Sequence, residues 1–218
     1  MPAYANRSRA ALLAMASPLV AATRALLSSP AALDAARAVE EAALALDLEV
    51  SGRRAATSRL SAEVAAAIAR EDSLDRRVAG LHRALDGLRA MGLGAAEDLL
   101  ERLFPAGLGT VIGPSGRAQV PEYQRLADAL HDARDEAGAA HFAGLLPALR
   151  DDLRAYCAAT LDKDEAHREG AARATGAAEA AAALKQALTH LDRVVELEAG
   201  GPTAALYQRW ALVVRGIS

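Results

Sequence analysis

Small and apolar residues recur every three or four positions along most of this chain, and this spacing constrains the fold more than any other feature. In an α-helix, residues with that spacing fall on one face, which a second helix can cover. About a quarter of the residues are alanine, which has the highest helix propensity. The sequence therefore predicts an all-α fold: an antiparallel, up-down bundle of long alanine-rich helices with a short irregular or β-hairpin insertion near residues 105–120.

The first long seam of this kind keeps its spacing from Ala32 to Leu88, as in a helical bundle or coiled coil. Its members are Ala32, Ala36, Val39, Ala43, Leu46, Val50, Arg53, Thr57, Leu60, Val64, Ala67, Glu71, Leu74, Val78, Leu81, Leu85 and Leu88. Ser51-Gly52 is the best candidate for a break, because glycine readily closes a helix end. A register that continues past this point equally fits one helix about 90 Å long.

A second seam with the same spacing extends from Leu146 to Val195 and can lie along the first. Gly200-Gly201-Pro202 ends it, and a last short helix follows. We expect Trp210, the only tryptophan, to anchor that helix on the bundle.

The N-terminal region has two proline signals and an unusual charge. Ser17-Pro18 and Ser29-Pro30 each place a capping hydroxyl before proline, so we expect a first helix, kinked or restarted at Pro18, that ends near Ser28. Residues 1–33 contain no Asp or Glu, which gives them some resemblance to a targeting segment. The apolar run is shorter than the roughly 20 residues of a membrane span. We predict a cytoplasmic protein without a transmembrane span, with a cleaved targeting segment within residues 1–33 as the alternative.

The chain length of 218 residues fits a single domain. We expect one helical-bundle domain over residues 1–218, with N-terminal helices in 1–104, a Gly/Pro-rich hairpin or loop at 105–120 and C-terminal helices in 121–218.

Glycine and proline are concentrated in residues 105–120, where the sequence favours turns rather than a long helix. The β-branched pair Val111-Ile112 followed by Gly113-Pro114-Ser115-Gly116 predicts a hairpin of Thr110–Ile112 against Arg117–Val120. An apolar pair at a hairpin tip would be exposed and would attract a partner. The alternative, which we favour, is that this segment is a plain connection between helices. The candidate contact residues are Val111, Ile112, Pro114 and Arg117.

Both seams also carry polar side chains at some positions. These are Arg53, Thr57 and Glu71 in the first seam and Thr160, Lys163 and His167 in the second. Antiparallel segments would bring them together as a buried polar cluster of Arg53, Thr57, Glu71, Lys163 and His167. The alternative, which we favour, is that they lie on exposed helix faces, because burying so many charges is costly.

The motifs of the common catalytic and metal-binding classes are missing from the sequence. It has no Glu-x-x-His pair, no His-Glu-x-x-His, no cysteine cluster, no G-x-S-x-G and no phosphate-binding glycine motif. We therefore expect no catalytic residues, no cofactor and no metal. A net charge of −3 opposes nonspecific nucleic-acid binding.

These observations favour a noncatalytic helical bundle that works by protein contact or self-association. The alternative is a small-ligand-binding or catalytic bundle that uses the polar cluster.

Overall fold

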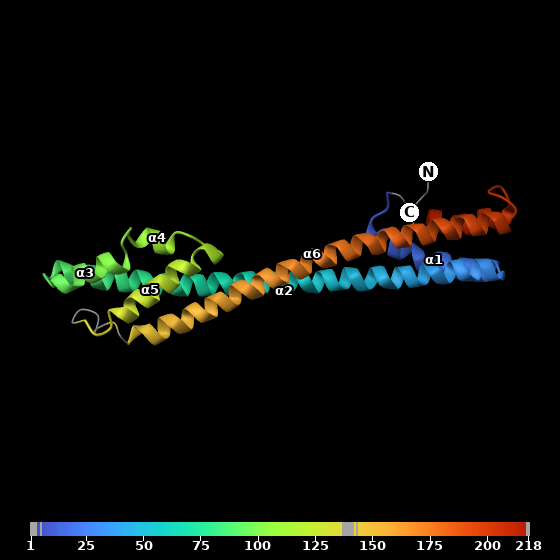
Figure 1. Cartoon of the computed structure of the whole chain (residues 1–218). Coiled ribbons are helices and arrows are strands. Elements are labelled where there is room, and N and C mark those ends of the chain that lie inside the picture. Colours follow the sequence, from blue (N-terminus) through green and yellow to red (C-terminus); the bar gives the residue numbers. More distant parts are fainter. Residues whose placement is uncertain (1–3, 5, 137–141, 143, 217–218) are drawn as a thin grey trace. The chain divides into compact units, whose positions relative to one another are not determined.

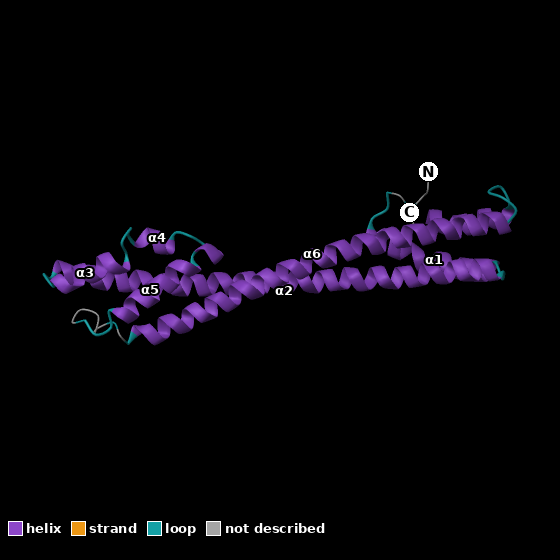
Figure 2. Ribbon diagram, in the orientation of Figure 1, coloured by secondary structure: helices purple, strands orange, loops and turns teal. Residues whose placement is uncertain are grey.

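The computed structural model describes residues 4, 6–136, 142 and 144–216, and for residues 214–216 it describes the backbone alone. These residues form helices and contain no strand, so the predicted all-α fold class is confirmed (Figures 1 and 2). In chain order the helices are α1 (Arg9–Leu26), α2 (Pro30–Ala90), α3 (Gly94–Leu103), α4 (Leu108–Ile112), the 3-10 helix η1 (Gly116–Ala118), α5 (Val120–Asp132), α6 (Leu145–Glu198) and α7 (Ala205–Gly216).

The predicted hairpin at residues 105–120, all of which are described, is wrong. Thr110–Ile112 lies in α4, Arg117 lies in η1, and Val120 begins α5. The backbone bonds locally: the Gly113 amide donates to the Gly109 carbonyl at 2.9 Å, four residues back. The β-propensity of the Val-Ile pair is overridden because the short helix buries Val111 completely in a hydrophobic core.

The helix termini and prolines agree only partly with the expectations from sequence. Ser29 caps α2 as predicted, since its hydroxyl accepts a hydrogen bond from the Ala32 amide at 3.0 Å. Pro18 lies inside α1, so no new helix starts there. The long helix α2 continues through Ser51-Gly52 without a break.

The chain forms two compact units, and α2 and α6 each contribute to both. Unit 1 comprises Met1–Thr57 and Glu169–Ser218, and unit 2 comprises Ser58–Arg168.

In unit 1, parts of α1, α2, α6 and α7 enclose one hydrophobic core. The Ser29 hydroxyl contacts Glu198, and Glu49 lies 3.5 Å from Arg173, so α2 and α6 run in opposite directions within this unit. Trp210 of α7 is buried here and anchors its helix, as predicted. The largest buried aliphatic side chains are Leu12, Met15, Leu19, Val39, Leu46, Leu184, Leu188, Leu191 and Val195.

Helix α1 is long and apolar enough to cross a membrane, as judged by its length and composition alone. In the structure, a third of its residues are buried in unit 1. The apolar face of α1 therefore contributes to the core of this unit.

In unit 2, parts of α2 and α6 pack with α3, α4 and α5 around a second core. Eight residues of the predicted seams are buried in this core, four from each of the two long helices. They are Leu74, Val78, Leu81 and Leu85 in α2, and Leu146, Leu149, Leu153 and Tyr156 in α6.

Candidate functional site

A network of polar side chains holds residues 105–120 against the core of unit 2. The Gln119 side-chain amide donates hydrogen bonds to the Tyr123 hydroxyl at 2.8 Å and to the Asp75 carboxylate at 2.9 Å. Tyr123 also donates to Asp75, and the Tyr156 hydroxyl donates to the Gly116 carbonyl at 2.9 Å. This network ties the connection between α4 and α5 to both long helices, so the connection is part of the packed unit.

The tyrosines of this network remain protonated at neutral pH. Burial raises the pKa of Tyr156 to about 12, with a smaller contribution from Glu71. Burial and the hydrogen bond to Asp75 raise the pKa of Tyr123 still further. Both phenols therefore act as hydrogen-bond donors, and neither is activated as a base or nucleophile.

The structure places the four predicted contact residues of this region in different environments. Val111 is fully buried, so it offers no exposed apolar surface. Ile112 and Pro114 are half-buried. Arg117 is exposed and forms an ion pair with Asp164 at 2.5 Å. A contact role for Ile112, Pro114 and Arg117 stays a prediction.

The five residues of the predicted polar cluster are divided between the two units. Arg53 and Thr57 belong to unit 1 and are exposed on α2. Glu71, Lys163 and His167 belong to unit 2, where the first two are half-buried and His167 is exposed. The interpretation as exposed helix faces therefore fits Arg53, Thr57 and His167, and a shared function of all five stays a prediction.

Unit 2 also contains a small cavity of about 290 Å³ between the start of α5 and the middle of α6. Its lining is mostly apolar and consists of Arg117, Val120, Pro121, Cys157, Thr160 and Leu161. The Thr160 hydroxyl is buried and has no hydrogen-bond partner among the described residues. Burial raises the pKa of the Cys157 thiol, which keeps the sulfur in its unreactive form.

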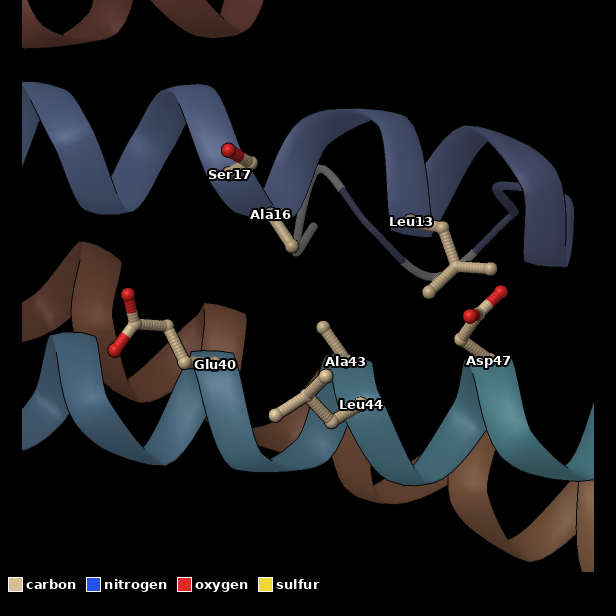
Figure 3. A pocket seen from close by; sticks show the side chains of 7 residues that line it. All are labelled: Leu13, Ala16, Ser17, Glu40, Ala43, Leu44 and Asp47. Atoms are coloured by element: carbon tan, nitrogen blue, oxygen red, sulfur yellow. The ribbon is translucent and has the colours of Figure 1, made fainter.

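A groove in unit 1, larger than the cavity of unit 2, lies between α1 and α2, and we call it the α1–α2 groove (Figure 3). Its volume is about 500 Å³. Leu13, Ala16 and Ser17 of α1 form one wall, and Glu40, Ala43, Leu44 and Asp47 of α2 form the other. Helical spacing places these residues on the facing sides of the two helices. The result is an apolar groove between two helices with carboxylates on its rim.

The two carboxylates of the groove differ in their partners. Glu40 accepts two hydrogen bonds from the guanidinium of Arg24, at 2.8 and 2.7 Å. Asp47 is exposed, and no ion pair formed within the described residues involves it. Figure 3 shows the two carboxylates at either end of the labelled α2 residues, with Ala43 and Leu44 between them.

Two exposed leucines of α2 lie at the groove: Leu44 is part of its lining, and Leu48 follows one turn later on the same helix. Leu44 is 66% exposed and Leu48 is 71% exposed, and they lie one helical turn apart. Neither leucine was predicted to be a contact residue, because both lie outside the seam of small and apolar residues. The sequence nevertheless contains a signal for an exposed apolar patch. The two leucines are four residues apart, outside the seam, and their neighbours include Glu and Asp.

No protein-family model, curated protein or solved structure matches this chain. Within the ranges that the structure describes, no group of three or more His, Cys, Asp or Glu side chains is arranged to hold a metal ion. The geometry of the α1–α2 groove is therefore the principal guide to function.

Proposed function

We propose that this protein is a noncatalytic, antiparallel helical bundle that works by protein contact through the α1–α2 groove. The observation that carries this proposal is the pair of exposed leucines, Leu44 and Leu48, beside an apolar groove. A single exposed leucine is common on protein surfaces, but two adjacent ones that continue an apolar groove are typical of a binding surface. Fully burying a leucine side chain contributes about 1.5–3 kcal/mol, so a partner that covers both gains several kcal/mol.

A catalytic role is less well supported by the same structure. The pKa values of Tyr123, Tyr156 and Cys157 are all raised, which favours their protonated and unreactive forms. A tyrosine or cysteine that acts as a base or nucleophile is usually activated by a lowered pKa.

The burial of α1 in unit 1 supports a core position for the apolar N-terminal segment. On this basis we propose a cytoplasmic protein without a transmembrane span. The overall negative charge supports a protein partner or a second copy of the chain over a nucleic acid.

The test replaces both leucines with polar residues of similar size, as Leu44→Gln/Leu48→Gln. The binding probe is a fluorescein-labelled amphipathic peptide of leucine, alanine and arginine, followed by fluorescence anisotropy. Light scattering of the unlabelled protein reports self-association. We expect the double variant to weaken peptide binding, or any self-association, at least tenfold.

The matched control is Leu197→Gln, which removes an 81% exposed leucine from α6 in the same unit but outside the groove. It should leave binding unchanged. The proposal fails if the wild-type protein is monomeric and binds no amphipathic peptide, or if Leu44→Gln/Leu48→Gln behaves like the control.

A further inference from the structure

The α2 wall of the groove belongs to a locally acidic segment. Residues 38–52 contain Glu40, Glu41, Asp47 and Glu49, and they contain no Lys, Arg or His. Arg24 of α1 pairs with Glu40, and Arg173 of α6 pairs with Glu49. For Glu41 and Asp47, no ion pair with another described residue is formed. The carboxylates of Glu41 and Asp47 therefore leave negative charge on α2 beside the exposed leucines.

The two ends of the groove differ in charge as a result. Glu40 and Asp47 are seven residues apart, which corresponds to about 10 Å along the helix. At the Glu40 end, the guanidinium of Arg24 neutralises the carboxylate from within the chain. At the Asp47 end, no guanidinium of the described residues forms an ion pair with the carboxylate, so an incoming cation has no such pair to displace.

The walls of the groove also restrict the backbone conformation of a partner. Both walls are α-helices, whose backbone N–H and C=O groups are bonded within each helix. An extended peptide would find no strand edge to pair with, and its backbone polar groups would lie unpaired against apolar side chains. A helix satisfies its own backbone groups and can place an apolar face in the groove.

We infer that the occupant of the α1–α2 groove is an amphipathic helix of another protein, with apolar residues on one face and an Arg or Lys that pairs with Asp47. This inference rests on the proposed function and adds the chemistry of the partner. The leucines supply most of the affinity because they bury apolar surface. The cation at Asp47 fixes the orientation of the partner helix and raises the association rate.

The experiment compares two labelled peptides that share one leucine-alanine face and differ only in their flanking residues, which are arginine in one and glutamate in the other. Binding to the full-length protein is measured by fluorescence anisotropy at low and high salt. We expect the arginine peptide to bind at least tenfold more tightly than the glutamate peptide at low salt. The difference should shrink at high salt because exposed charges are screened.

Asp47→Asn then tests the position of the cation. Exposed ion pairs contribute modestly, so we expect binding of the arginine peptide to weaken about two- to fivefold and binding of the glutamate peptide to improve. Glu179→Gln is the matched control, because it removes an exposed carboxylate from α6 of the same unit, outside the groove. This control should change neither affinity.

The possible results separate the two proposals. Equal binding of both peptides, or equal effects of Asp47→Asn and Glu179→Gln, overturns the basic-helix inference while contact through the groove stands. The basic-helix inference is also overturned if the protein binds neither peptide but self-associates, and Leu44→Gln/Leu48→Gln abolishes that self-association. The occupant of the groove is then a second copy of the chain. Absence of both peptide binding and self-association overturns the proposed function itself.

Discussion

Thr23→Val should destabilise unit 1, because the Thr23 hydroxyl accepts a hydrogen bond from the indole of Trp210 inside the core. The Nε1–Oγ1 distance is 2.9 Å, and both side chains are buried. The same hydroxyl donates to the Leu19 carbonyl at 2.8 Å, which orients its lone pairs toward the indole. Valine has the same branched shape as threonine, so the substitution removes the acceptor without opening a cavity.

The expected magnitude follows from the group that is left without a partner. A buried donor that loses its acceptor costs about 1–3 kcal/mol. The Leu19 carbonyl still accepts the helical hydrogen bond from the amide of residue 23, so losing the Thr23 hydroxyl at this carbonyl adds little to the cost. The extra buried methyl group of valine offsets about 0.8 kcal/mol of this cost. We therefore expect the free energy of unfolding to fall by about 0.2–2 kcal/mol.

Urea denaturation followed by far-ultraviolet circular dichroism measures this change. Thr175→Val is the matched control, since this exposed hydroxyl on α6 of the same unit only donates to the Ala171 carbonyl of its own helix. Its effect should stay within about 0.5 kcal/mol. In a Trp210→Phe background the indole donor is gone, so Thr23→Val should cost less than in the wild type. An equal penalty in both backgrounds would refute the reasoning.

Two further predictions concern the tyrosines and the connection before α5. Burial raises the pKa values of Tyr156 and Tyr207 to about 12, whereas an unfolded tyrosine ionises near pH 10. The contribution of these tyrosines to the free energy of unfolding should therefore be fully present below about pH 10. It should be lost as the pH rises toward 12, because the unfolded chain releases these protons at a lower pH than the folded protein does. Tyrosinate absorbance of the folded protein checks this prediction, and ionisation of these two residues near pH 10 would contradict it. Val111→Ala should lower the free energy of unfolding in urea by about 2 kcal/mol, because the side chain is fully buried. The control Ile68→Ala, at a site in the same unit that is 53% exposed, should have little effect in the same titration.

The helices and their buried faces were predictable because their signals are local. The three-four spacing of leucine and alanine predicted the buried residues of α2 and α6 in both units, such as Leu46, Leu85 and Leu188. Ser29 predicted the start of α2. Each of these features depends on residues within one or two helical turns.

Residues 105–120 were not predicted correctly, because their conformation depends on distant residues. Turn residues and the pair Val111-Ile112 favour a hairpin in isolation. In the structure, Asp75 of α2 and Tyr156 of α6 bond to this segment through Gln119 and Gly116, and Val111 enters the core. Those partners are separated from the segment by about 40 residues on either side, so no local pattern reveals them.

The sequence by itself determined that this protein is helical and which leucines of its two long helices enter the cores, because propensity and periodicity act within a few turns. Only the tertiary structure decided where side chains remain uncovered. Leu44 and Leu48 are exposed because the elements packed on α2 do not cover this part of it, and no arginine of the described residues pairs with Asp47 as Arg24 does with Glu40. The candidate site therefore depends on which segments pack together, and the periodicity of a single helix cannot specify that.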